Sequence, residues 1–351
     1  MFIENLPGEK AASFPDGVAI VDFDSGVRLT WPELFDRTSF LADFMFRRNK
    51  VNPSDVVLCG SRDAVFNASL FFACLSVGAV LARGEGLSAD EVGMLSPRLS
   101  FGLPGGLPGT LEDLGFRSGA DPVFEVETPE GSPALLTRES EGVFRIVSHS
   151  MLSVDSIASV LSDGILRSDV ACCGGGFFDL EAISLHLLPV LVAGGSVAFG
   201  NAVDEGCVTL ASGDAAFWGR HAFPEARSRK FILRGFGDAS SFPAKAGLDP
   251  VFVCGRAGTR AFIGTRVAGG GVVLGTAGFN LKARVVDAGG ADAEEGGPGR
   301  LSMRGCSLFS GFWNNPAVTS SCLRKGWTDL GVGAVRRDGV FYLTEVSHGR
   351  A

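Results

Sequence analysis

Short apolar runs alternate with segments of helical periodicity from the start of the chain to about residue 255. The first run, at 18–21, ends in a turn-forming Asp-Ser-Gly at 24–26 and predicts a strand. A helix is predicted to begin after Thr30, which is a favourable N-cap. Pro32 suits the first turn of that helix, and Glu33 lies three residues after the cap, as in a capping box.

Later segments repeat this alternation. Residues 55–59 predict a buried strand, and residues 64–81 predict a largely apolar helix that runs into the next strand. In the middle third, strands are predicted at 133–137, 169–173 and 194–199, and helices at 150–161 and 180–193. A strand, a helix and a strand in succession imply parallel pairing, so the pattern predicts α/β units.

The pattern changes beyond residue 255. Glycine becomes dense, helical periodicity fades, and short β runs follow at 282–286, 300–303 and 340–343. We therefore expect an α/β fold with two sheet-and-helix lobes, at 1–130 and 131–255. A small β-rich, barrel-like subdomain is expected at 256–351.

The composition is typical of a globular protein, with 351 residues of which 46% are hydrophobic and 20% charged. Because the net charge is −8, the chain has no excess of basic residues for a phosphate backbone, and nucleic acid is not an expected partner. No apolar run reaches the ~18 residues of a membrane-spanning helix, so membrane insertion is not expected. The N-terminal segment lacks the basic and apolar regions of a signal or transit peptide. We expect an intracellular protein in a reducing compartment, either the cytoplasm or an organelle matrix.

Chemically distinctive residues are sparse. The eight cysteines show no C-x-x-C spacing, so reduced core thiols are expected rather than a zinc or redox site. The four histidines lie far apart, and none falls in a nucleophile, metal or acid–base motif. The glycines at 174–176 follow a predicted strand, but they lack the spacing and the later acidic residue of a dinucleotide-binding turn.

Segments spread along the chain resemble motifs of adenylate-forming enzymes of the acyl-CoA synthetase type. The opening FPDGVAIVDFDSGVRLTWPEL resembles the family's P-D-x-x-A strand followed by L-T-Y-x-E-L. LSVGAVLA, LLPVLVAGGSVAF and GRLSMRGCSLFSGFWNNPAVT resemble later motifs in the same order. The resemblance implies the large N-terminal domain of an enzyme that joins a carboxylate to ATP and passes the acyl group to a thiol.

The resemblance aligns residues 137–146 with the family's phosphate loop, T-S-G-T-T-G-x-P-K-G. That loop cradles phosphates with backbone amides and hydroxyls. The vestigial nucleotide-site positions here are two hydroxyls, a glycine and a cation: Thr137, Ser140, Gly142 and Arg145.

Substitutions in this segment argue against phosphate binding. Glu139 and Glu141 place two carboxylates beside a polyphosphate, and a like-charge pair at ~4 Å costs about 1 kcal/mol even in water. Glu139 and Ile146 also replace glycines, which removes backbone freedom. We expect residues 137–146 to form a polar connection between a strand and a helix, with ATP and magnesium binding lost.

Three other motifs of the resemblance are altered. Phe178 stands where the family has a histidine near the acyl pocket, so it is a candidate acyl-pocket residue or a buried core aromatic. In the segment that matches Y-G-x-T-E, only Gly255 is kept, and Gly258 offers no oxygen ligand for magnesium. The ribose-binding aspartate of T-G-D is either Asp329 or has been replaced by a valine or glycine, depending on the alignment. An exposed turn aspartate is the alternative interpretation of Asp329.

The resemblance ends where the family's hinge leads to the small C-terminal domain, which carries the adenylation lysine and completes the site. Without that domain, we expect a catalytically degenerate acyl-CoA synthetase-like pseudoenzyme with no catalytic residue and no metal. Its expected role is as a structural or binding subunit of a larger protein complex. Two alternatives stay open: a divergent adenylate-forming enzyme that works with a separate C-terminal domain, and an acyl or small-molecule binder without ATP.

Other protein subunits are therefore the expected partners. Loops near 137–149, 254–259 and 326–333 would lack their usual cover, and Val143, Phe144 and Ile146 would add apolar surface there. A contiguous exposed apolar surface commonly marks a protein interface.

Overall fold

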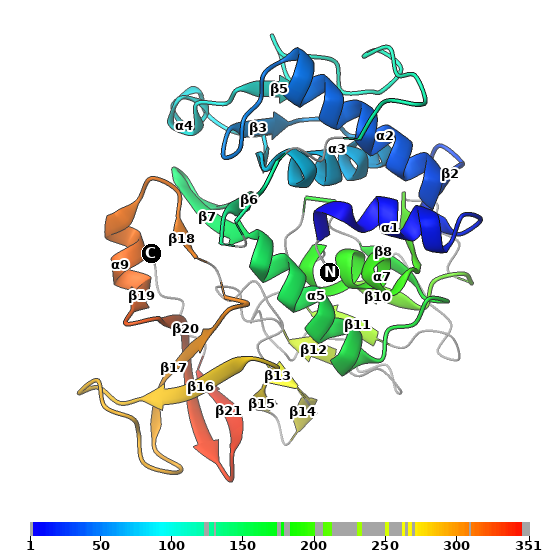
Figure 1. The fold of residues 1–351 in the computed structure, drawn as a ribbon. Coiled ribbons are helices and arrows are strands. Elements are labelled where there is room, and N and C mark those ends of the chain that lie inside the picture. Colours follow the sequence, from blue (N-terminus) through cyan, green and yellow to red (C-terminus); the bar gives the residue numbers. More distant parts are fainter. Residues whose placement is uncertain are drawn as a thin grey trace.

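Three β-sheets organise the part of the chain that the structure describes (Figure 1). The structure is a computed structural model. It describes residues 3–122, 126–129, 131–173, 177–178, 183–200, 206–212, 230–233, 250–252, 262–263, 266–268, 271–308 and 310–345.

The first sheet has six strands in the order β18-β7-β6-β4-β3-β5. Its strands are β3 (Val56–Cys59), β4 (Val80–Arg83), β5 (Leu99–Phe101), β6 (Pro133–Ser140), β7 (Val143–Ser148) and β18 (Gly311–Phe312). β3 pairs in parallel with β4 and β5, and β4 pairs in parallel with β6, as the strand–helix–strand pattern predicts. The pairs β6–β7 and β7–β18 are antiparallel.

The second sheet has seven strands in the order β12-β11-β10-β8-β9-β1-β2. Its strands are β1 (Val18–Asp22), β2 (Val27–Thr30), β8 (Val170–Cys173), β9 (Ser196–Phe199), β10 (Leu210–Ser212), β11 (Lys230–Leu233) and β12 (Pro250–Phe252). β1 pairs in parallel with β9, so the start of the chain joins a sheet built mainly from its middle.

The two sheets therefore do not divide the chain at residue 130. β1 and β2 belong to the sheet of the predicted second lobe, whereas β6 and β7 belong to the sheet of the predicted first lobe. A periodicity-based prediction misses this exchange because it identifies strands but not their neighbours.

The third sheet has eight strands, and its main path runs β13-β15-β21-β20-β17-β16. Its strands are β13 (Phe262–Ile263), β14 (Arg266–Ala268), β15 (Gly271–Ala277), β16 (Leu281–Val286), β17 (Pro298–Gly305), β19 (Leu323–Arg324), β20 (Trp327–Arg337) and β21 (Val340–Glu345). These strands bury a separate core around Leu301, Met303 and Phe341. The predicted β-rich character of the last third is confirmed.

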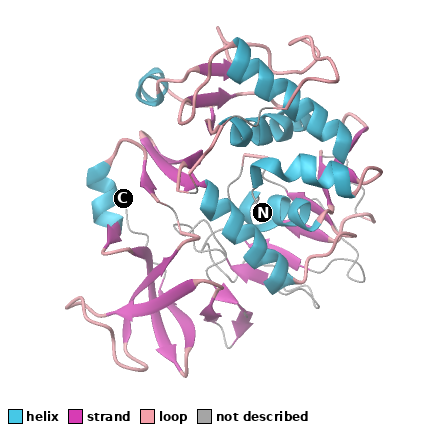
Figure 2. Ribbon diagram, viewed as in Figure 1, coloured by secondary structure: helices cyan, strands magenta, loops and turns pink. Residues whose placement is uncertain are grey.

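Helices fill the space between the first two sheets (Figure 2). The α-helices are α1 (Leu6–Ser13), α2 (Trp31–Asp43), α3 (Ala64–Val77), α4 (Ala89–Leu95), α5 (His149–Asp163), α7 (Leu188–Ala193) and α9 (Pro316–Cys322). Shorter turns of other helical types are η1 (Ile3–Asn5), η2 (Phe44–Arg48) and η3 (Ile183–Leu187). In the described part of the chain, no helix combines the length and the apolar character needed to cross a membrane.

The main core joins α2 and α3 to both sheets. Trp31, Leu34 and Phe66 are fully buried in it, and Cys59 and Cys74 lie there as core thiols, as predicted. Cys207 and Cys306 are exposed, so for these two the prediction of a core thiol is wrong. Burial raises the pKa of the Cys59 thiol to about 12, which keeps that thiol protonated and unreactive.

The ends of the helices follow local sequence signals. At α2 the Thr30 hydroxyl accepts from the Glu33 amide, and the Glu33 carboxylate accepts from the Thr30 amide, which confirms the predicted capping box. The helix predicted at 64–81 ends earlier, at Val77. Gly78 adopts a left-handed conformation (φ 68°) that terminates α3 and lets β4 begin.

Replacing Thr30 by alanine should lower the free energy of unfolding by about 1 kcal/mol, because the first turn of α2 loses a side-chain acceptor. Urea unfolding followed by circular dichroism measures this change. Thr30→Ser keeps the acceptor and should stay close to the unmodified protein. Equal destabilisation by both substitutions would contradict the capping role.

Candidate functional site

The segment aligned with the phosphate loop folds as a tight β-hairpin. β6 and β7 pair from Pro133↔Ser148 to Ser140↔Val143, and the turn places Gly142 at φ 67°. The predicted polar connection from a strand to a helix is therefore wrong. The run of β-branched and aromatic residues at 143–147 favours a strand, and a short turn with a left-handed glycine closes the hairpin.

Hairpin formation commits the backbone of this segment to strand pairing. β6 lies between β4 and β7, and β7 lies between β6 and β18. A phosphate cradle instead needs several neighbouring amides that point at the ligand. Within the described hairpin, residues 137–140 of β6 pair only with β7, because β4 pairs with β6 only at Leu135 and Leu136. β18 pairs with β7 only at Arg145 and Ile146.

Glu91 fastens the hairpin turn to the rest of the sheet. It belongs to the first turn of α4, whose N-cap is Ser88. One carboxylate oxygen accepts from the Gly142 amide at 3.0 Å and from Arg138 Nε at 2.7 Å. The other accepts from the Ser88 amide at 2.9 Å and from Arg138 Nη2 at 3.1 Å. Only 2% of Glu91 is exposed, so a buried carboxylate has its charge balanced by four donors.

These donors hold the Glu91 carboxylate in its charged form. The Gly142 amide has the largest effect, the Ser88 amide follows, and Arg138 adds to both, so the pKa of Glu91 falls to about 2. Sequence reasoning missed Glu91 and Arg138. The Ser-x-x-Glu spacing of a capping box was available as a signal for the helix start, but it carries no information about a contact with the hairpin.

The cation predicted for the phosphate site has another partner. Arg145 donates through Nε to Glu139 at 3.0 Å, and its side chain is only 9% exposed. Arg145 also lies directly opposite Thr137 in the hairpin register, so these two predicted site residues are brought together. Ser140 is exposed near the turn.

Asp329 lies in β20 rather than in an exposed turn. Its side chain forms an ion pair with Arg300 of the neighbouring strand β17 and accepts from the Gly331 amide at 2.8 Å. The side chain is 24% exposed. This arrangement fixes the position of Asp329, and its role at a ribose stays a prediction.

Phe178 lies at the edge of the main core. Its ring contacts the ring of Phe177 edge-on, with 5.8 Å between centroids, and Phe177 in turn packs against Phe71. A role in an acyl pocket stays a prediction for Phe178, and Gly255 and Gly258 lie outside the described residues.

The apolar residues of the hairpin are not exposed as expected. Phe144 is buried at 1% exposure against the outer side of the first sheet, and Val143 and Ile146 are half-buried. In a strand, successive side chains point to opposite faces of the sheet, so part of this segment is buried, whereas an open loop would leave it exposed.

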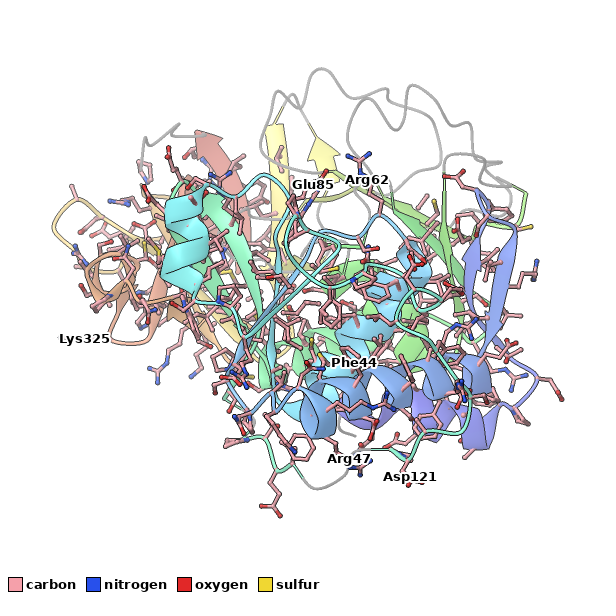
Figure 3. All side chains as sticks on the ribbon, turned by 90° about the horizontal axis from the view of Figure 1, so that it is seen from above. Phe44, Arg47, Arg62, Glu85, Asp121 and Lys325 are labelled. Atoms are coloured by element: carbon pink, nitrogen blue, oxygen red, sulfur yellow. The ribbon has the colours of Figure 1, made fainter. Side chains whose placement is uncertain are left out.

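A cavity of about 550 Å³ lies where the parallel strands β3, β4 and β5 end. Ligands commonly bind at this edge of open α/β sheets. Gly60 and Gly84 line this cavity. The Leu103 side chain packs so close to both that neither position has room for a Cβ atom. Arg62 and Glu85 both line the cavity and form an ion pair at 3.2 Å. Figure 3 labels the two side chains close to each other. Sequence reasoning did not identify this cavity.

His149 begins α5 directly after the hairpin. It is 5% exposed, and its Nε2 atom has no hydrogen-bond partner among the described residues. Burial lowers the pKa of His149 to about 4, so the imidazole is neutral at physiological pH.

The stability of the protein should fall as the pH drops from about 4.5 to about 2, partly through Glu91. In this interval the unfolded chain takes up a proton on that carboxyl, whereas the folded protein does not. The Glu91→Gln variant should be less stable near neutral pH and should lose this part of the acid dependence. Parallel pH profiles for the two proteins, obtained by urea unfolding, would contradict the assignment.

His149 should produce a second dependence at higher pH. Between pH 6.5 and about 4 the unfolded state binds a proton that the folded state excludes, which corresponds to about 3 kcal/mol of lost stability. His149→Phe should remove this component while it leaves the Glu91 component in place. A slope between pH 6.5 and 5 that is unchanged in the variant would show that His149 does not titrate as described.

Comparisons with known proteins locate the fold. No family model matches the chain. A feruloyl-CoA synthase from an Amycolatopsis species is 25% identical over 389 residues, which cover 97% of this chain and 77% of that protein.

Two solved structures from Mycobacterium tuberculosis share the fold. A fatty acyl CoA synthetase superposes with a TM-score of 0.79 at 16% identity, over 98% of this chain and 78% of the other. The N-terminal domain of FACL13 superposes with a TM-score of 0.79 at 17% identity, over 98% of this chain and 100% of that domain. The chain thus has the fold of the large N-terminal domain of adenylate-forming proteins of the acyl-CoA synthetase type.

Proposed function

We propose that this chain is an acyl-CoA synthetase-like protein without adenylation activity, which serves as a binding or structural subunit of a protein complex. The observation that carries the proposal is the closed β6–β7 hairpin at the position of the phosphate loop. β6 and β7 pair through their backbones, and the Gly142 amide at the turn donates to Glu91. A phosphate that accepted from the Gly142 amide would have to displace the Glu91 carboxylate.

Charge supports the same proposal. Arg145 is neutralised by Glu139, while Glu141 carries a further negative charge at the turn. A polyphosphate at this place would therefore meet carboxylates without a compensating cation. At an effective dielectric constant of about 20, two like charges ~4 Å apart repel by about 4 kcal/mol. That repulsion is comparable with the whole binding free energy of a millimolar ligand.

If the fold no longer binds a nucleotide, binding to another protein subunit is the function that we propose for it. The expected apolar surface at Val143, Phe144 and Ile146 does not support it, because these side chains are buried or half-buried. The partnership therefore rests on the lost nucleotide chemistry, and its direct test is the identification of proteins that co-purify with the native chain.

A second candidate function is a divergent acyl-activating enzyme. The match to a feruloyl-CoA synthase over 97% of the chain favours it. In that case the substrate would be an aryl carboxylate of the ferulate kind, and Phe178 would contact its ring. In an acyl or small-molecule binder without ATP, Phe178 would likewise contact the ligand.

Calorimetry should detect no binding of magnesium-ATP at millimolar nucleotide. The double variant Glu139→Gln, Glu141→Gln is the matched control, because it removes both carboxylates but leaves the hairpin closed. If the geometry of the hairpin excludes the nucleotide, the variant also stays silent. A magnesium-dependent dissociation constant below ~100 μM for the unmodified protein, about −5.5 kcal/mol, would refute the proposal.

Pyrophosphate exchange separates the two candidate functions. Exchange should stay at background with fatty, aryl and amino acids, ferulate included. Exchange that appears with ferulate, alone or after a separate C-terminal domain protein is added, would establish the enzyme instead.

A further inference from the structure

A second cavity, of about 430 Å³, lies on another side of the molecule. It is formed by η1, α1, α2, the end of α3 and Pro122. Arg47 donates to the carbonyls of Asp121 and Pro122, and Pro122 lines the cavity, so these residues lie beside it. In Figure 3, Arg47 and Asp121 lie at the bottom of the view, and Arg62 and Glu85 lie well above them. The cavity is therefore remote from the carboxyl ends of β3, β4 and β5.

The walls are largely apolar. Phe35, Pro7, Ala42 and Pro122 line the cavity, and Gly8 lies against the Phe35 ring. The volume falls within the range of about 300–1,000 Å³ that is typical of small-molecule sites. An apolar group of a ligand would find contacts here on several sides.

The hydroxyls in the wall do not need a ligand as a partner. Ser39 donates to the Phe35 carbonyl and Ser76 donates to the Phe72 carbonyl. Thr38 Oγ1 has no hydrogen-bond partner among the described residues, but the atom is itself fully buried, so it lies behind the cavity wall and does not contact a molecule in the cavity.

The charge around the cavity has one sign. Glu4 and Glu9 line it, and no lysine, arginine or histidine does so among the described residues. Two cations lie on the elements that form or flank the cavity. Arg47 pairs with Asp43 at 3.2 Å, and the Lys10 ammonium, which lies 5.5 Å from the centre of the Phe14 ring, also interacts with the Glu9 carboxylate. An anionic ligand would be repelled. A cation would be attracted by both carboxylates and by the face of an aromatic ring such as Phe35.

We propose that this cavity binds a small organic cation, an ammonium group that carries an apolar chain. The ammonium lies near Glu4 and Glu9, and the chain packs between Phe35, Ala42 and Pro122. The proposal is independent of the function proposed above, because the cavity shares no residue with the hairpin.

The test is calorimetry with hexylammonium as the probe, compared with hexanoate, which has a similar chain and the opposite charge. Hexylammonium should bind to the full chain, and hexanoate should bind at least about tenfold more weakly. Equal affinities for the two probes, or no binding of hexylammonium at millimolar concentration, would overturn the proposal.

Three variants locate the binding. In Gly8→Val the new side chain occupies the cavity, because a Cβ atom at Gly8 already lies 3.0 Å from the Phe35 ring, and affinity should fall at least about tenfold. Glu9→Gln keeps the shape and removes one charge, so it should weaken hexylammonium several-fold and leave hexanol, the uncharged analogue, unchanged. Glu85→Gln, at the other cavity, is the control and should bind like the unmodified protein.

Thermal unfolding shows whether each variant folds. If Gly8→Val does not fold, the comparison rests on Glu9→Gln, because residue 9 is exposed and tolerates the substitution. Hexylammonium binding that is unaffected by Glu9→Gln, or that is lost in Glu85→Gln, would overturn the assignment to this cavity.

Discussion

The buried carboxylate of Glu91 is the interaction on which the candidate site depends. It joins three segments that are distant in sequence: the cap of α4, the strand β6 through Arg138, and the hairpin turn at Gly142. A buried charge is stable only when donors surround it, and here those donors come from the backbone and from one arginine. The conformation of the turn is therefore tied to the folded state of the whole first sheet.

The sheet order explains why the hairpin closes. β6 has β4 on one side and β7 on the other, and β18 covers the outer edge of β7. Each pairing uses amides that an open loop would leave for a ligand. The ion pair of Arg145 with Glu139 completes this arrangement, because the remaining cation of the segment is engaged within the protein. Strand pairing and the Arg145–Glu139 ion pair therefore engage these groups within the protein.

Much of the fold could be predicted from local sequence signals. The capping box at Thr30 and Glu33, the apolar core of α3 and the β-rich last third all follow from residues close to one another in the chain. The exchange of strands between the two sheets could not be predicted, because it depends on contacts between segments more than a hundred residues apart, such as Ile20 and Val197. The same limit applies to Glu91, whose partners Arg138 and Gly142 lie far along the chain. The strand-forming residues at 143–147 do indicate the second strand of the hairpin, but the family's loop motif, to which this segment aligns, does not.

Residues 137–146 form a hairpin whose turn amide, that of Gly142, donates to the Glu91 carboxylate. Hydrogen exchange at the Gly142 amide, measured with and without magnesium-ATP, tests this arrangement most directly. We expect slow exchange that is unchanged by the nucleotide and becomes fast in the Glu91→Ala variant, because alanine removes the acceptor of the Gly142 amide. Fast exchange in the unmodified protein that slows when magnesium-ATP is added would contradict it, because an open loop would then be closing on a bound phosphate.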